Sequence, residues 1–278
     1  MDHQLFLSLA EKSFDAIADG NRVFLPAEGA EVPILERPLV GFAAADDPLF
    51  ERFSDEAVIG PEWKGPREWM PEGETVAGFF FPFTEEILRR ARAETNLTGE
   101  AWNLGYSACF PLIDAFLDTL VSLLGAEGAK VCQPNRDPSL RRTMTEVMSG
   151  GEEDLRFSVG WSNRHVCYAA GLGTFGLHRH LITEMGCAGS LASFITDAKL
   201  APTPRNYEGV YDYCIGCLAC ARRCPAGAIT RENLRNLKKC SAHSARIREE
   251  FGGGFCGKCL FGGACARKNP SAGKAEGE

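Results

Sequence analysis

The chain has 278 residues, of which 45% are hydrophobic and 24% charged, and a formal net charge of −7. These proportions are those of a globular protein and exclude collagen-like, disordered and disulfide-stapled miniprotein classes. The longest apolar run, residues 76–83, is far shorter than the roughly 20 residues that a membrane-spanning helix needs. The first residues also lack the basic segment of a secretory signal. We therefore expect a cytoplasmic protein with no membrane partner.

The N-terminal half alternates between patterns of helix and strand. Residues 2–19 predict an amphipathic helix, because their apolar side chains recur at helical spacing. Short apolar runs bordered by Gly or Pro predict strands at residues 39–42, 76–81, 129–132 and 191–196. Between the first two strands, residues 46–75 are rich in Pro, Gly and Trp and predict a long irregular connection.

Three further helices are predicted from their starting residues. Thr84 is a candidate cap for one helix, and Pro111 is expected to open a longer one. Asp137 and Pro138 predict a third helix, with Met144 and Val147 on its inner face. The interleaved pattern predicts an α+β protein with an N-terminal mixed α/β domain over residues 1–200.

The C-terminal part differs in composition from the rest of the chain. Residues 200–206 have the composition of a linker, so we place a second domain at residues 201–267 and a flexible tail at residues 268–278. Residues 214–278 hold 12 Lys and Arg against 5 Asp and Glu, although the whole chain is acidic. This basic end is also the cysteine-rich end, because eight of the 12 cysteines fall within residues 214–265.

The spacing of these cysteines is the strongest motif in the chain. Cys214-x2-Cys217-x2-Cys220-x3-Cys224-Pro225 matches the bacterial ferredoxin run for a 4Fe-4S cluster, whose fourth cysteine ligates the other cluster when two are present. In a reducing cytosol, metal ligation is favoured over disulfides, and a single zinc ion needs only four thiolates. A second set of four follows the run: Cys240, Cys256, Cys259 and Cys265. We therefore predict a ferredoxin-like domain with two 4Fe-4S clusters.

Ligand sharing between two clusters divides the eight cysteines into two sets. One set is Cys214, Cys217, Cys220 and Cys265, and the other is Cys224, Cys240, Cys256 and Cys259. The alternative in which Cys224 and Cys265 change places stays open. Basic residues nearby either offset the charge of the clusters or form a solvated face that docks an acidic donor or nucleic acid: Arg222, Arg223, Lys238, Lys239 and Lys258. The remaining cysteines lack ligand spacing and are interpreted as buried small hydrophobic residues: Cys109, Cys132, Cys167 and Cys187.

Residues 168–176, with the sequence YAAGLGTFG, and the later segments 181–183 and 194–197 carry a family resemblance. Together with the cysteine pattern, they resemble the epoxyqueuosine reductase family and, more distantly, the corrinoid-dependent reductive dehalogenases. The resemblance spans roughly residues 100–265 and indicates a shorter, divergent branch. It implies an N-terminal domain that holds cobalamin, a ferredoxin-like domain that passes electrons to cobalt, and a corrinoid beside Gly171, Gly173 and Gly176. It also implies tRNA as a partner.

The chain departs from that family at two points. Residues 157–165 contain no acidic residue where the family carries its catalytic acid, and Gly176-Leu177-His178 stands where the family has Gly-Lys-Asn. The three glycines also match a dinucleotide fingerprint, with Asp197 as the ribose ligand. Residues 162–170 instead predict a capped helix that ends at Gly171, which disfavours nicotinamide binding.

Several side chains near the glycines are candidates for catalysis. Arg164, His165 and His178, with His180, are placed to donate protons or bind anions, and the alternative is that they decorate a helix and a loop. Tyr106 and Tyr168 are candidate proton donors, with packing as the alternative. We take His165, Arg164, Tyr106 and His178 as the candidate catalytic residues.

These observations support two functions. The first is an iron-sulfur oxidoreductase that relays electrons through two clusters to a corrinoid or substrate in the N-terminal domain, supplied by a low-potential donor such as ferredoxin or flavodoxin. The alternative is an electron-transfer or reductive-activation protein that serves a partner, such as a corrinoid protein, and has no substrate chemistry of its own. The missing acid favours this alternative. A third hypothesis, an RNA-binding modification factor, rests on the basic C-terminal end.

Overall fold

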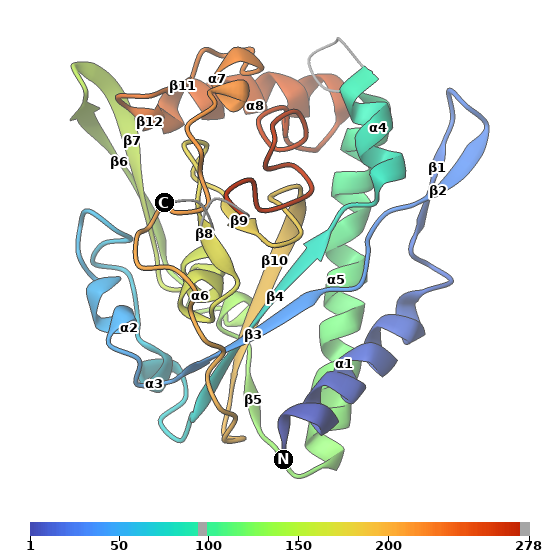
Figure 1. The fold of residues 1–278 in the computed structure, drawn as a ribbon, viewed down its shortest axis with the longest axis vertical. Helices are drawn as coiled ribbons and strands as arrows, with labels where there is room; N and C mark the ends of the chain where they lie inside the picture. The colour runs from blue at the N-terminus through green and yellow to red at the C-terminus, as the bar shows by residue number, and fades with distance from the viewer. Residues whose placement is uncertain (94–98, 273–278) are drawn as a thin grey trace.

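A computed structural model describes residues 1–93 and 99–272 of the chain. At its centre lies a four-stranded antiparallel sheet in the order β3 (Leu39–Ala44), β4 (Thr75–Pro82), β10 (Gly189–Thr196) and β5 (Val131–Cys132) (Figure 1). All four predicted strands are confirmed. Every residue of β4 is buried, and Phe79 and Phe81 face one core while Phe80 faces the other. The strand is apolar throughout because both faces of the sheet are covered.

Two helices cover one face of the sheet, α1 (His3–Ile17) and α5 (Glu100–Ala126). The first confirms the predicted amphipathic helix, and Phe116 of α5 packs on Phe79 and Phe81 with ring centroids 5.6 and 5.0 Å apart. The expected start at Pro111 is wrong, because α5 begins at Glu100 and contains Pro111 in its interior. Proline removes one helical hydrogen bond there, and the buried apolar face of the surrounding turns keeps the helix intact.

Helix α5 is also long and apolar enough, by length and composition, to cross a membrane. In this fold its Ile113 and Phe116 are buried in the core, whereas Asp114 and Asp118 pair with Arg136 outside it. The helix therefore packs on the sheet as part of the protein core. The expectation of no membrane partner stays a prediction.

The other face of the sheet carries α6 (Asn163–Ala169) and residues 46–75, which are irregular as predicted except for the one-turn helices α2 (Leu49–Arg52) and α3 (Pro66–Trp69). Gly41 and Gly78, paired across β3 and β4, let α6 approach the sheet. A Cβ atom would lie 2.3 Å from the Ala170 carbonyl oxygen at Gly41, and 3.0 Å from Cys167 Sγ at Gly78. These two glycines therefore set the position of α6 and of the polar side chains that it carries.

The prediction of a helix after Pro138 is wrong. Residues 142–159 form the hairpin of β6 (Arg142–Ser149) and β7 (Glu152–Val159), and Met144 is 57% exposed instead of facing inward. Gly150 and Gly151 both take positive φ angles at the turn, which is the conformation that a tight hairpin needs. The β-branched residues at alternate positions of β6 also favour a strand.

Three smaller elements complete the N-terminal part. Helix α4 (Glu85–Ala93) begins after Thr84 as predicted, and Thr84 Oγ1 accepts a hydrogen bond from Ile87 N at 3.4 Å. The sequence interpretation missed the hairpin of β1 (Arg22–Leu25) and β2 (Ala30–Pro33) and did not identify that of β8 (Gly173–Phe175) and β9 (Leu181–Thr183). These hairpins are short, so they show little periodicity.

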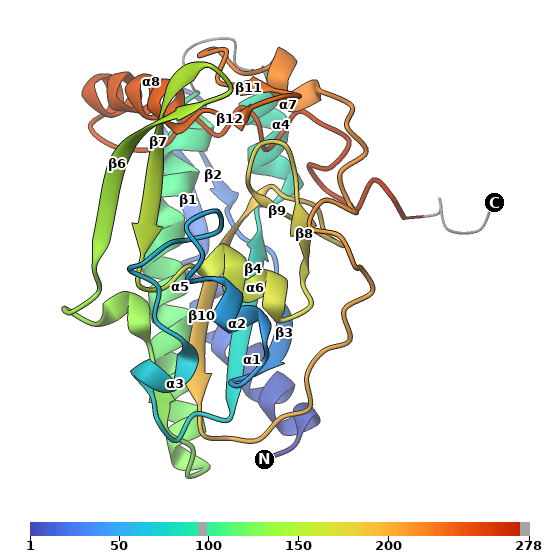
Figure 2. The ribbon, with the colours of Figure 1, turned by 90° about the vertical axis from the view of Figure 1, so that its left-hand side faces the viewer.

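The cysteine-rich part gathers at one end of the molecule, opposite the N terminus (Figures 1 and 2). It contains α7 (Ala219–Arg222), β11 (Ile229–Thr230), β12 (Leu234–Arg235) and α8 (Leu237–Phe251). The predicted linker is bound to the N-terminal part, because Thr203 exchanges two hydrogen bonds with Phe42 and Arg205 pairs with Asp47 at 2.8 Å. The domain boundaries at residues 200 and 267 stay a prediction.

The segment predicted as a flexible tail is described only in part. Asn269 is buried, and its Nδ2 donates to Glu184 Oε1 at 3.2 Å. Residues 268–272 therefore pack against the fold at this point, whereas residues 273–278 lie outside the described residues.

Candidate metal centre and active site

Four of the predicted ligand cysteines line one small pocket, and we call them the first thiol group: Cys214, Cys217, Cys220 and Cys265. Cys214 and Cys217 come from the loop that leads into α7, Cys220 lies in α7 itself, and Cys265 comes from the C-terminal loop. Gly216 and Leu218 both take left-handed backbone conformations, with φ angles of 63° and 57°, and these reverse the chain tightly between the cysteines. Four thiols around one hollow match the ligand number of a 4Fe-4S cluster.

The other four predicted ligands form the second thiol group: Cys224, Cys240, Cys256 and Cys259. Burial raises the pKa of Cys259 well above its usual range, Arg235 opposes this shift, and the neighbouring thiols of Cys256, Cys240 and Cys224 raise the pKa further. The structure therefore brings together the same two sets that ligand sharing assigns, with Cys265 in the first and Cys224 in the second.

Two further side chains lie beside the first thiol group. His178 Nε2 and Cys187 Sγ are each 3.7 Å from Cys265 Sγ. His178 Nδ1 accepts a hydrogen bond from the His180 amide at 3.1 Å, so the hydrogen of the neutral ring is carried on Nε2, toward the sulfur. The hydrogen bond from Cys187, opposed by burial, and then the one from His178 lower the pKa of Cys265 to about 5. Such a shift favours the thiolate, the form that binds metal.

Cys187 departs from its interpretation as only a small hydrophobic residue. It is buried as expected, but His178, Cys187 and Cys265 place their ligand atoms within 4.8 Å of one another. The sequence gives no sign of this, because Cys187 and Cys265 are far apart in the chain. The other three cysteines of that class, Cys109, Cys132 and Cys167, are buried or half-buried.

A cationic group lies next to the second thiol group, and Arg235 is its innermost member. Its side chain is 6% exposed, its Nη1 donates to His180 Nε2 at 2.7 Å, and its Nε has no hydrogen-bond partner among the described residues. Arg235 also opposes the raised pKa values of Cys240 and Cys259, which places its charge beside their thiols. Sequence reasoning missed this residue, although it lies between two ligand cysteines in the chain.

Arg164 is the second cation of this group, and the phenol of Tyr106 lies near it. Arg164, on α6, donates from Nη1 to the Arg179 carbonyl oxygen at 2.9 Å. Burial, and then the charge of Arg235, lowers the pKa of Arg164 to about 10. Burial, and then Cys109, raises the pKa of Tyr106 to about 12, while Arg164 opposes the shift. Near neutral pH both arginines are therefore cations and Tyr106 keeps its proton.

Aromatic rings connect this group to the loop of the second thiols. The Tyr106 ring lies 5.7 Å from those of Trp102 and Phe255, and Phe255 in turn contacts His180 at 6.2 Å. Phe255 precedes the ligand cysteine at position 256. Burial, followed by the charges of Arg235 and Arg164, holds the pKa of His180 well below its usual range, so the ring is neutral and accepts the Arg235 hydrogen bond.

The structure separates the four candidate catalytic residues. It places the Tyr106 ring against Phe255, which precedes the ligand Cys256, and His178 beside the first thiol group. Arg164 lies near Tyr106 and opposes the rise of its pKa. His165 joins neither group, because its ring packs on Phe53 at 5.5 Å and its Nδ1 lies 2.8 Å from Ser162 Oγ. Burial, and then Arg164, lowers the pKa of His165 to about 3, so it is a neutral packing residue.

The three glycines expected to cradle a corrinoid are already in contact with protein atoms. A Cβ atom would lie 3.1 Å from Thr203 Cγ2 at Gly171, 1.9 Å from the Ile182 carbonyl oxygen at Gly173, and 2.7 Å from His178 Cε1 at Gly176. This turn therefore does not fit a corrinoid. The predicted helix end at Gly171 is confirmed by its φ angle of 81°, and strand β8 follows where a dinucleotide turn would need a helix.

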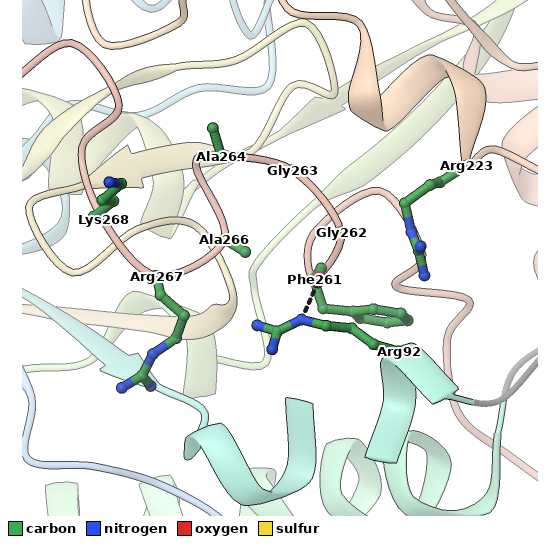
Figure 3. Close-up of a pocket in the computed structure, with 9 residues that line it drawn as sticks. All are labelled: Arg92, Arg223, Phe261, Gly262, Gly263, Ala264, Ala266, Arg267 and Lys268. Atoms are coloured by element: carbon green, nitrogen blue, oxygen red, sulfur yellow. Dashed lines mark hydrogen bonds between the residues drawn. The ribbon is translucent and has the colours of Figure 1, made fainter. Parts of the chain in front are cut away.

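A second group of basic residues lines a cavity near the first thiol group. A cavity of about 270 Å³ beside the first thiol group is lined by four cations, Arg92, Arg223, Arg267 and Lys268, around Phe261 (Figure 3). Arg92 Nε donates to the Phe261 carbonyl oxygen at 2.7 Å, as the dashed line in Figure 3 marks.

Two predicted counter-charges for the clusters are paired outside them. Lys238 pairs with Glu146 and Glu153, and Lys239 pairs with Glu152, on the hairpin of β6 and β7. These two lysines therefore attach α8 to the hairpin. The buried charge beside the second thiol group comes from Arg235 instead.

The comparisons with known proteins agree with this geometry. The 4Fe-4S binding domain family matches residues 207–230, which contain the ferredoxin-type cysteine run. Fold and site thus define a mixed α/β protein with a C-terminal ferredoxin-type 4Fe-4S binding domain. No curated protein sequence matches the chain.

Solved structures share most of the fold. Epoxyqueuosine reductase from Bacillus subtilis matches with a TM-score of 0.53 and 18% identity, over 95% of this chain and 66% of that one. The catabolic reductive dehalogenase NpRdhA matches with a TM-score of 0.55 and 16% identity, over 85% of this chain and 31% of that one. A reductive dehalogenase structure described with a mechanism for B12-dependent dehalogenation has a TM-score of 0.51 and 16% identity, over 80% of this chain and 29% of that one.

These matches confirm the resemblance drawn from the sequence at the level of the fold. The identities are those of a divergent branch. The chain spans about two thirds of the length of the first structure and less than a third of the dehalogenases.

Proposed function

We propose that the chain is an iron-sulfur reductase in which two 4Fe-4S clusters pass electrons to a substrate held by Tyr106, Arg164 and Arg235. The observation that carries the proposal is a series of contacts that joins Tyr106 to Arg235: the Tyr106 ring lies 5.7 Å from that of Phe255, Phe255 contacts His180, and Arg235 donates to His180 at 2.7 Å. Arg164 is close enough to Tyr106 and Arg235 for their charges to act on one another. A phenol that keeps its proton next to buried cations is a group suited to protonating a substrate as it is reduced.

The two thiol groups differ in their access to a donor. Cys217 of the first group is exposed, and the cationic cavity lies beside this group. An acidic, low-potential donor such as ferredoxin or flavodoxin fits that surface by charge. In the proposal, electrons enter at the first group and leave from the second.

The residues of the chain have distinct parts in this reaction. When bound, the clusters supply single electrons, which is the chemistry that the side chains themselves lack. Arg164 and Arg235 bind and orient the substrate, and His180 holds Arg235 through the hydrogen bond at Nε2. Tyr106 donates its proton to the reduced substrate and recovers one from water.

A corrinoid acceptor is a second candidate, because one structure of the same fold is described as B12-dependent. The filled glycine turn does not support it, so no step of the proposal passes through cobalt. Anaerobic titration with cob(II)alamin, followed by electron paramagnetic resonance, tests it directly. We expect no conversion to the base-off form, and stoichiometric conversion would replace the direct transfer proposed here.

The alternative of a pure electron-transfer protein, with a corrinoid protein as one partner, rests on the missing acid in residues 157–165. A tRNA partner rests on the basic C-terminal end and is tested by salt-dependent binding.

The proposal itself predicts about eight iron atoms per chain after anaerobic reconstitution, reducible by ferredoxin or flavodoxin. Bound zinc, or iron for one cluster only, would contradict it.

A further inference from the structure

Arg235, which is 6% exposed, and Arg164, which is half-buried, place two like charges near each other without a carboxylate. None of the ion pairs within residues 1–93 and 99–272 includes either side chain. Among the described residues, Arg164 has one hydrogen-bond partner, the Arg179 carbonyl oxygen, and its charged neighbours are Arg235 and Arg179. Buried charges in proteins are normally paired, so this pair lacks an anion.

The clusters account for only part of the missing charge. Arg235 acts on the thiols of Cys240 and Cys259, so a cluster bound there would neutralise it from one side. The groups that shift the pKa of Arg164 are Arg235, Tyr106 and Arg179, and no ligand cysteine is among them. Among the described residues, Arg164 therefore has no anionic partner.

Unused hydrogen-bonding groups occur in the same region. Arg235 Nε is buried and has no partner among the described residues, and the same is true of both polar atoms of the Asn103 side chain. Asn103 is 5% exposed, lies one helical turn before Tyr106, and packs against Gly254, which precedes Phe255. Arg164 and His180 keep part of their surfaces exposed to solvent.

We propose that the substrate carries an oxyanion, a carboxylate or a phosphate group, that is bound by Arg164 and Arg235, with the atom to be reduced beside Tyr106. The guanidinium fork matches both oxyanions, and its donors are strongest where water is excluded. This inference rests on the proposed function and names the substrate class of the same site.

The test is a binding titration on the oxidised, reconstituted holoprotein, without any electron transfer. Inorganic phosphate and acetate serve as separate probes, so that the two oxyanion sources are distinguished. We expect saturable binding of at least one probe and at least a tenfold weaker affinity in Arg164→Met. Arg164→Lys keeps the charge but loses the fork, and we expect an intermediate affinity. Arg222→Met, on the exposed side of α7, is the matched control and should bind like the wild type.

Iron content and circular dichroism of each variant confirm that the protein is folded and loaded. The inference is overturned if Arg164→Met binds the probes as well as the wild type does. It is also overturned if neither probe binds at about 10 mM, where a site with a Kd of about 1 mM would be filled. Either result, with two clusters present, leaves the electron relay of the proposed function standing and removes only the role of the arginines in binding the substrate. Loss of the proposed function shows separately, as a missing cluster.

Discussion

The two thiol groups have the same ligand number and opposite surroundings. The first has an exposed member, Cys217, and a histidine, His178, whose Nε2 lies 3.7 Å from Cys265 Sγ. The second has a buried arginine beside it and a phenol and a second arginine beyond that. The difference indicates a direction: one cluster site is suited to receive electrons at the surface, and the other to deliver them inside.

Removing ligands should separate the two groups most strongly. We expect Cys220→Ser and Cys259→Ser each to lose about four of about eight iron atoms, because each belongs to a different set of four. Iron and sulfide analysis after anaerobic reconstitution measures this loss. Cys187→Ser is the matched control: its Sγ is 3.7 Å from Cys265 Sγ, yet we expect full iron content. Loss of iron in Cys187→Ser would make Cys187 a ligand and break the assignment.

The charge of Arg235 should distinguish the second cluster from the first. Replacing it by Met removes a buried cation, and the loss of a nearby unit charge at an effective dielectric constant of about 20 costs the reduced cluster roughly 2 kcal/mol, or on the order of 100 mV. We expect the potential of one cluster to fall by that amount in an anaerobic titration and the other to stay unchanged. A uniform shift of both clusters, or none, would show that Arg235 does not belong to the second site.

His178 should have the complementary effect on the first cluster. Its hydrogen bond to Cys265 favours the reduced, more negative cluster, so His178→Ala should lower that potential. A net contribution of about 0.5–1.5 kcal/mol corresponds to roughly 20–65 mV. His165→Phe is a control that alters a buried histidine of the neighbouring helix. If both histidine variants shift the potential equally, the effect is structural and the hydrogen bond does not tune the cluster.

The pH dependence of stability should single out His165, which belongs to neither thiol group. Its pKa is lowered from 6.5 to about 3, so the unfolded chain binds a proton below pH 6.5 that the folded chain does not. Stability is therefore present above pH 6.5 and is lost as the pH falls toward 3.

Denaturant unfolding at pH 7 and 5.5 measures this loss. We expect His165→Phe to lose about 1 kcal/mol less than the wild type between these two values. Parallel losses in both proteins would place an ionisable, accessible histidine at this position.

The local patterns of the sequence predicted the sheet and the ferredoxin-type cysteine run well, whereas the division of the ligands into two sets stays a prediction. Residues 76–81 are apolar without interruption because β4 is covered on both faces, and cysteine spacing is a short-range property of one loop. The Pro111 and Pro138 predictions failed because tertiary packing outweighed proline in α5, and because turn glycines formed a hairpin where a cap was expected.

The missed parts of the site are those that depend on contacts distant in the chain. Cys187 reaches Cys265, and Arg164 on α6 reaches Arg235, only through the packing of the two parts of the molecule. No spacing rule connects these residues. The only sign in the sequence that Arg235 belongs to the site is its place between Cys224 and Cys240. The sequence interpretation assigned the role of counter-charge to other basic residues instead.

Spin quantification by electron paramagnetic resonance, after anaerobic reduction of the reconstituted protein with excess reduced ferredoxin, tests the relay most directly. The account predicts about two unpaired spins per chain, with signals broadened by the coupling of two neighbouring clusters. Reduction of only one cluster, or a spectrum without spins in a protein that retains its iron, would contradict electron transfer from the first thiol group to the second.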